Sequence, residues 1–105
     1  MIKITILYPN KENGRFDMDY YINKHMPMSI EKFGPALKKV IIETGINAGV
    51  PGSQPPYIAI CSLFFESQEA FETAFTPIMP ALTADMPNYT DIDIIFQISE
   101  VKIMQ

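Results

Sequence analysis

The 105-residue sequence predicts a single α+β domain, residues 1–105, with elements in the order β-α-β-β-α-β. Three observations support this fold class. Four segments carry the alternating or continuous apolar pattern of strands, and two others repeat apolar residues at helical spacing. The chain is also too short for two cores. With 48% hydrophobic and 19% charged residues, its composition is that of an ordinary globular domain.

The first strand is marked by an alternating pattern at the beginning of the chain. Ile2, Ile4 and Ile6 recur at every second position, and Tyr8 continues the same face. A period of two is typical of a strand with one buried face. We expect the strand to end at Pro9, which precedes a polar loop.

The first helix is expected to begin at Asp17, whose carboxylate can cap it. Five residues share one face at helical spacing: Met18, Tyr21, Ile22, His25 and Ser29. Pro27 lies inside this pattern and should bend or break the helix just after His25, because proline has no backbone donor. A carbonyl freed near residue 23 could then orient the His25 ring.

The middle of the chain predicts two strands joined by a long connection. Residues 37–44 form the second predicted strand and residues 57–65, apolar at almost every position, the third. Residues 45–56 between them contain three glycines and three prolines. This composition predicts an irregular hairpin connection.

The last third of the chain predicts a helix, a shorter helix and a strand. Ser67 begins an amphipathic helix that Pro77 and Pro80 interrupt. A short helical piece is expected at residues 81–86, and the last strand at residues 92–103. The complete order is the split βαβ, or ferredoxin-like, arrangement, with both helices on one face of the sheet.

The strands predict that the second face of the sheet is also buried. In the third strand one face holds Ile58, Ile60 and Phe64, and the other holds Tyr57, Ala59, Cys61, Leu63 and Phe65. In the last strand Ile94, Phe96 and Ile98 oppose Ile95, Val101 and Ile103. A sheet with one solvated face would alternate more cleanly. The simplest cover is a second copy, which would make a homodimer with a dimeric α/β barrel; the alternative is a sheet that exposes some apolar side chains.

Charge and motifs exclude several classes of function. A net charge of −4 with scattered basic residues predicts no nucleic-acid partner. No apolar run is long enough for a membrane span, so a cytoplasmic protein is expected. One histidine and one cysteine, Cys61, cannot build a zinc site or an internal disulfide. No phosphate-binding or dinucleotide-binding motif is present, so no metal and no cofactor is expected.

His25 is the only histidine and the only side chain whose ordinary pKa lies near neutrality. It shares a helix face with Tyr21, and two interpretations are open. His25 is either a general acid or base in a pocket, or a partly buried side chain that hydrogen-bonds to the backbone. Tyr21 and Tyr8 can likewise line a ligand pocket or simply fill the core with their hydroxyls at its rim.

Two segments resemble the EthD family, named for ethyl tert-butyl ether degradation. Residues 20–28 (YYINKHMPM) resemble its Y-[YW]-x-x-x-H-x-P-[LM] segment. Residues 84–91 (ADMPNYTD), followed by residues 96–101 (FQISEV), resemble its C-terminal A-D-[VI]-P-N-[FY]-T segment and closing strand. The resemblance implies a dimeric α/β barrel and a cavity between helix and sheet that the matched histidine, His25, faces.

The sequence and the resemblance together lead to two hypotheses. The first is a small enzyme or enzyme accessory that binds a compact apolar or aromatic, oxygenated metabolite. His25 would act in cofactor-independent acid–base or oxygenase-type chemistry, with Tyr8 and Tyr21 binding substrate and Asp85 at the pocket edge. The second is a non-catalytic binding or scavenging protein for an oxidative degradation pathway, which needs the same cavity but no proton transfer. Neither hypothesis names the substrate.

Overall fold

A computed structural model describes all residues of the chain, 1–105. Its elements are β1 (Ile2–Pro9), α1 (Met18–Tyr20), η1 (Tyr21–His25), α2 (Met26–Phe33), η2 (Gly34–Ala36), β2 (Lys39–Thr44), β3 (Tyr57–Phe65), α3 (Gln68–Phe75), α4 (Met79–Asp85), η3 (Met86–Asn88) and β4 (Ile95–Glu100). η1 is one π-helical turn, and η2 and η3 are 3₁₀ turns. The predicted β-α-β-β-α-β order is confirmed.

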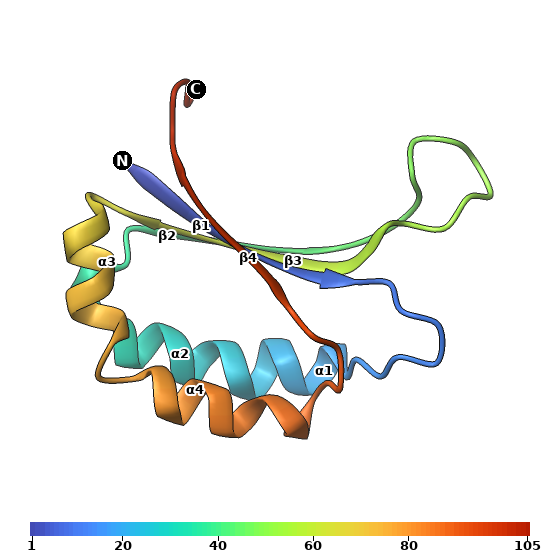
Figure 1. Cartoon of the computed structure of the whole chain (residues 1–105), viewed down its shortest axis with the longest axis horizontal. Helices are drawn as coiled ribbons and strands as arrows, with labels where there is room; N and C mark the ends of the chain where they lie inside the picture. Colours follow the sequence, from blue (N-terminus) through green and yellow to red (C-terminus); the bar gives the residue numbers. More distant parts are fainter.

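The four strands form one antiparallel sheet in the order β2-β3-β1-β4. β1 and β3 are central, and Ile4 of β1 lies opposite Leu63 of β3 and Ile98 of β4. All helices lie on one side of this sheet, and the β2–β3 connection extends beyond its end (Figure 1). The molecule therefore has two layers, with one core between them.

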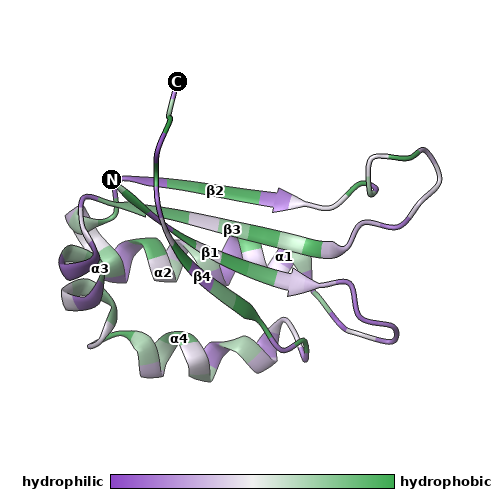
Figure 2. Cartoon of the chain, turned by 45° about the horizontal axis from the view of Figure 1, so that its top comes forward, coloured by the Kyte–Doolittle hydropathy of each residue, from purple (hydrophilic) through white to green (hydrophobic).

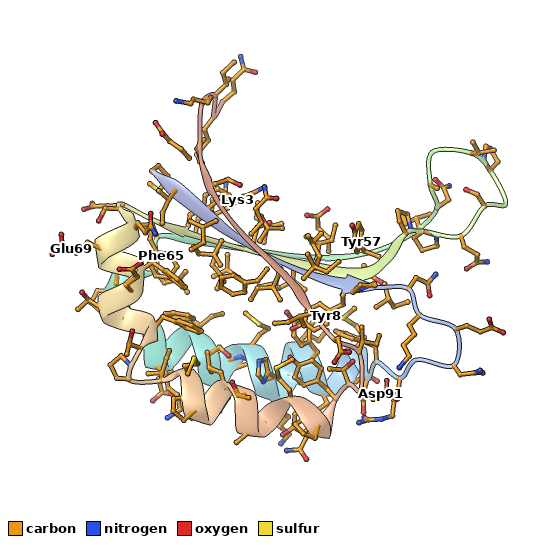
Figure 3. All side chains as sticks on the ribbon, viewed as in Figure 1. Lys3, Tyr8, Tyr57, Phe65, Glu69 and Asp91 are labelled. Atoms are coloured by element: carbon orange, nitrogen blue, oxygen red, sulfur yellow. The ribbon has the colours of Figure 1, made fainter.

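The core lies between the sheet and the helices. The strand residues that face it alternate along β1 and β3, and Tyr8 and Phe65 point toward the helices while Lys3 lies on the other side (Figure 3). From the helices, Tyr21, Met26, Phe33 and Phe71 complete the buried cluster. The predicted inner face of the sheet is thus confirmed.

The outer face of the sheet carries no helix, although the strands are hydrophobic along much of their length (Figure 2). On this face Leu7 of β1 lies between Ile60 of β3 and Ile95 of β4, and the neighbouring row is the polar Thr5, Ser62 and Gln97. Ile95 is 47% exposed and Ile41 of β2 is 37% exposed. The strand pattern predicted that a second copy buries this face, and in the single chain its apolar residues are exposed or half-buried.

Of the predicted bend or break at Pro27, the break does not occur, because the chain stays helical from η1 into α2. Instead, the chain widens just before the proline into η1, where the Met26 N–H donates to the Tyr21 carbonyl five residues earlier. A proline has no N–H to donate and its ring crowds the carbonyl four residues before it. A π turn makes room for both, and α2 then continues to Phe33.

Two other predictions needed correction. Ile22 is 45% exposed rather than on the buried face, because a π turn advances each residue by less than an α turn does. The last strand is shorter than residues 92–103, because its partner β1 begins at Ile2, which pairs with Glu100. Beyond that pair one more bond follows, from the Val101 N–H to the Met1 carbonyl.

The predicted helix starts are confirmed by their capping bonds. The Asp17 carboxylate accepts from the Tyr20 N–H at 3.0 Å, and the Ser67 hydroxyl accepts from the Ala70 N–H at 3.0 Å. Each cap satisfies a backbone donor that the first turn leaves without a partner. None of the helices combines the length and apolar character needed to traverse a membrane.

Candidate functional site

The chemistry of the site centres on a contact between two helical segments, η1 and α4. His25, the last residue of η1, places Nδ1 2.9 Å from Oδ2 of Asp85, the last residue of α4. The two side chains are 8% and 17% exposed. The ring is thus oriented by a carboxylate 60 residues away in sequence, not by a freed backbone carbonyl near residue 23 as predicted.

Asp85 is held by two further donors. The Tyr20 hydroxyl donates to Oδ1 at 2.7 Å, and the Asn88 amide donates to the same oxygen at 2.9 Å. Burial opposes ionisation of Asp85, but the hydrogen bonds from Asn88, His25 and Tyr20 outweigh it and lower the pKa of the carboxyl. Asp85 is therefore a carboxylate at neutral pH.

The charge on Asp85 fixes the tautomer of His25. A carboxylate can only accept hydrogen bonds, so Nδ1 of the ring must carry the hydrogen. Burial lowers the pKa of His25, although Asp85 partly opposes this shift. The ring is therefore neutral at neutral pH, with the lone pair on Nε2, and no protein group bonds that nitrogen. This is the arrangement of a general base.

Aromatic rings and a backbone contact hold the imidazole in place. Tyr21 stacks on His25 at 5.7 Å between ring centroids and 14° between planes, and Tyr89 lies at 4.6 Å and 52°. The Ser29 hydroxyl donates to the His25 carbonyl at 2.8 Å. Since the rings and the carboxylate surround the imidazole on several sides, it has little freedom to rotate.

His25 lines an apolar cavity with two adjoining lobes between the sheet and the helices. The lobes measure about 40 and 80 Å³. Of the 14 residues around the smaller lobe, 12 are hydrophobic. Both lobes share the same six wall residues: Ile6, Tyr8, His25, Phe75, Leu82 and Phe96. A cavity of about 150 Å³ holds benzene, so the two lobes, which are smaller, suit a ligand no larger than about one ring.

The structure brings together three of the four residues predicted for the site around this cavity. His25, Tyr8 and Tyr21 line it. Asp85 does not; both its oxygens are bonded to protein groups, and it acts on the cavity through His25. The predicted pocket-edge role of Asp85 is therefore replaced by a supporting one.

Tyr89 and Asn88 were not among the four site residues predicted from the sequence. Tyr89 lines the larger lobe, and its hydroxyl lies 2.9 Å from that of Tyr8. Asn88 holds Asp85 as described. A signal existed, because Asn88 and Tyr89 lie three and four residues after Asp85 within the second motif, residues 84–91.

The remaining titratable groups near the cavity stay protonated at neutral pH. Burial raises the pKa of Cys61 to about 11, and it raises the pKa values of Tyr8, Tyr21 and Tyr89. Cys61 therefore behaves as a buried thiol and not as a nucleophile. No group of three or more His, Cys, Asp or Glu side chains lies close enough together to hold a metal ion.

Comparisons with known proteins give consistent results. The model of the EthD domain matches residues 15–93. An EthD-like protein from Ralstonia eutropha JMP134 shares 36% identity at a TM-score of 0.94, over 99% of this chain and 94% of that one. An EthD family protein from Bacillus halodurans C-125 shares 21% identity at a TM-score of 0.71, over 96% and 98%.

More distant structures share the fold alone. A dimeric ferredoxin-like protein from an uncultured marine organism shares 9% identity at a TM-score of 0.58, over 99% of this chain and 96% of that one. No curated protein matches the chain. The matched residues 15–93 contain both His25 and Asp85, so the resemblance that the two motifs predicted is confirmed. The chain belongs to the EthD family.

Proposed function

We propose that this protein binds a compact, mostly apolar molecule in the cavity and moves a proton to or from it through Nε2 of His25. The observation that carries the proposal is the 2.9 Å contact between His25 Nδ1 and the Asp85 carboxylate. It leaves Nε2 as the basic nitrogen beside an apolar space. Tyr8 and Tyr21, which line the same space, would position the ligand.

The surroundings favour proton transfer over other steps that a histidine could perform. As His25 takes a proton it becomes cationic, and the adjacent Asp85 carboxylate stabilises that cation. The apolar walls exclude water, which strengthens this interaction. Oxygenase-type chemistry would begin with the same step, because molecular oxygen oxidises an electron-rich anion more readily than the neutral molecule.

Solvent deuterium exchange into compact carbon acids tests the proposal. Aryl ketones, nitroalkanes and arylacetonitriles would be incubated with the protein in D₂O, and loss of the C–H signal followed by NMR, with oxygen uptake recorded in parallel. The native protein should accelerate exchange in at least one class. His25→Gln should reduce the rate by about 10² to 10⁴-fold.

One further variant and a control separate the role of Asp85 from that of His25. Asp85→Asn should slow exchange while leaving ligand affinity nearly unchanged, because Asp85 does not line the cavity. Lys24→Gln, an exposed neighbour of His25, should match the native protein. Exchange that is equally fast in the native protein and His25→Gln would remove His25 as the base.

A second candidate is a non-catalytic binding protein. The observation that favours it is the small, largely hydrophobic lining, in which 12 of 14 residues around the inner lobe are apolar. Such a site can retain a hydrophobic metabolite without transforming it. Thermal stabilisation by aromatic compounds with no exchange, no oxygen uptake and no product would favour this function.

We also propose that two copies associate through the outer faces of their sheets. The face carries Leu7, Ile41, Ile60 and Ile95, and no element of the chain covers it. An extended apolar surface of this kind is typical of an interface. A structure with the same fold is described as a dimeric ferredoxin-like protein, which is consistent with a dimeric α/β barrel here.

A further inference from the structure

The paired hydroxyls of Tyr8 and Tyr89 have no strong acceptor beyond each other. Their oxygens are 2.9 Å apart, and either can be the donor. Two hydroxyls carry two hydrogens, but a single bond between them uses only one. Neither hydroxyl bonds a backbone carbonyl, an amide oxygen or a carboxylate. The second hydrogen has only the Tyr21 hydroxyl, which itself lies beside the Cys61 thiol, as a protein partner, so it can turn to a ligand oxygen.

The environment favours a ligand that accepts from this hydrogen. Tyr8 is 2% exposed and Tyr89 is fully buried. A carbonyl or charged oxygen of a ligand is a stronger acceptor than a neighbouring phenol or thiol. Tyr21 packs edge-on against Tyr8 at 5.6 Å and adds a third hydroxyl that bonds no carbonyl or carboxylate.

The hydroxyl pair lies on the same cavity lobe as the base. Tyr8, Tyr89 and His25 all line the larger lobe, and the Tyr89 ring lies 4.6 Å from the imidazole. No lysine or arginine lines either lobe. Burial raises the pKa values of both tyrosines, so they remain neutral O–H donors. A single oxygen of a ligand beside His25 could accept from them.

We propose that the Tyr8–Tyr89 pair is an oxyanion-binding site and that the substrate is a compact carbonyl compound with an acidic C–H beside the carbonyl. This inference rests on the function proposed above. Nε2 of His25 takes the proton from that carbon, and the C–H electron pair forms a C=C bond. The carbonyl π electrons move onto oxygen, which gives an enolate. The proton can return from His25 to carbon, so no oxidant or reductant is needed.

The hydroxyl pair stabilises the enolate more than the neutral carbonyl. A hydrogen bond to a charged oxygen is stronger than one to a neutral oxygen, and donors fixed before the reaction need no reorganisation. A hydrocarbon would offer this hydrogen no oxygen acceptor. A phosphate or other multiply charged group would lack a cation, since the lobes contain no basic residue other than His25.

Binding of 4-nitrophenolate and nitrobenzene tests the oxyanion site separately from catalysis. The two probes share a ring and a nitro group, but only the phenolate presents an anionic oxygen, and its colour reports ionisation. Titrations at mildly alkaline pH would compare the native protein with Tyr89→Phe and Tyr8→Phe. Tyr57→Phe, whose residue lines neither lobe, is the matched control.

The native protein should bind 4-nitrophenolate more tightly than nitrobenzene and lower the pKa of the bound phenol. Tyr89→Phe should weaken phenolate binding about 10- to 100-fold, the usual value of one hydrogen bond to a charged group, and leave nitrobenzene binding nearly unchanged. Tyr8→Phe should have the same effect, which guards against one variant failing to fold. Tyr57→Phe should resemble the native protein.

The outcomes distinguish this inference from the proposed function. Nitrobenzene binding with no preference for the phenolate, or a preference that survives both phenylalanine variants, would overturn the oxyanion site alone. His25→Gln should keep the phenolate preference, because the hydroxyl pair is intact. A preserved preference together with unchanged deuterium exchange in His25→Gln would instead overturn the base and leave the oxyanion site standing. In the deuterium-exchange experiment, the rate for ketones should fall more in Tyr89→Phe than the rate for arylacetonitriles, whose carbanions place no charge on oxygen.

Discussion

His25 occupies a position that strongly disfavours its charged form. Its side chain is 8% exposed and is packed between Tyr21 and Tyr89. Only Asp85 offsets the lost hydration of the imidazolium. A neutral ring with a partner ready for the cation is suited to taking a proton during a reaction and releasing it afterwards.

The first prediction concerns stability as a function of pH. The pKa of His25 is lowered below its ordinary value of 6.5 in the folded protein. At a pH between the pKa in the folded protein and about 6.5, the unfolded chain binds more protons than the folded protein. The free energy of unfolding must therefore fall as pH falls through about 6.5, with a slope of at most about 1.4 kcal/mol per pH unit. Urea unfolding between pH 8 and pH 5 would measure it.

His25→Gln provides the control, because the chain has no other histidine. The free energy of unfolding of this variant should be flat across the upper part of that window. At lower pH both proteins should lose stability together, because Asp91 becomes protonated. The hydrogen bond from the Arg15 N–H lowers the pKa of Asp91 in the folded protein. An equal slope in both proteins near pH 6 would contradict the assignment.

The second prediction concerns the influence of Asp85 on the ring. The hydrogen bond and the charge of Asp85 both raise the pKa of His25 against the effect of burial. Asp85→Asn keeps the shape but removes the charge, so the pKa of His25 should fall further. The single histidine makes an NMR titration of the ring protons unambiguous. A pKa that rises in Asp85→Asn would show that the pair does not interact as described.

At this scale the sequence identified several residues but not their contacts. His25, Tyr8 and Tyr21 could be predicted from periodicity and residue chemistry, and Asp85 from the resemblance. The His25–Asp85 bond could not, because it joins residues 60 positions apart whose approach depends on how α4 packs beside η1. The structural interpretation of His25 assumed a backbone partner, and the actual partner is a carboxylate.

The elements show how local rules place the site. The π turn η1 accommodates Pro27 and ends on His25, so the proline in the first motif shapes the backbone that carries the base. π turns inside helices occur often at functional sites. The sequence predicted that Pro27 disturbs the helix but not how, because a break and a widened turn remove the same hydrogen bond.

The third prediction tests the cap of α3. Ser67→Ala removes the oxygen that accepts from the Ala70 N–H and should lower the free energy of unfolding by about 1 kcal/mol. Ser67→Asp retains an acceptor and should restore most of that loss. Because Ser67 lines neither lobe, 4-nitrophenolate affinity should be unchanged in both variants. A loss of affinity equal to that of Tyr89→Phe would indicate wider damage.

The whole molecule has one helical layer, which covers one face of the sheet. Burial of the outer face by a second copy stays a prediction. Which residues share a face could be read from sequence, because period two assigns faces directly. The length of β4 could not, because the end of a strand depends on where its neighbour begins.

The fourth prediction concerns assembly. Light scattering should give a mass of about twice 11.9 kDa for the native protein. Leu7→Lys places a charge at the centre of the outer face and should yield the monomer or lower dimer affinity by at least tenfold. Glu69→Lys, an exposed change on α3, should leave the mass unaltered. A native monomer at high concentration would contradict association through this face.

The connection between α4 and β4 has a consequence for ligand size. Leu82 and Met86 line the larger lobe from one side and Ile94 and Phe96 from the other. Asp85 lies on the same helix as Leu82 but does not line the lobe. A molecule that fits the closed lobes leaves Asp85 against His25, whereas one large enough to push α4 outward also withdraws the carboxylate from the imidazole. Ligand size and the basicity of His25 would then be coupled. An oversized ligand would be bound by a protein in which Asp85 no longer supports His25 as a base.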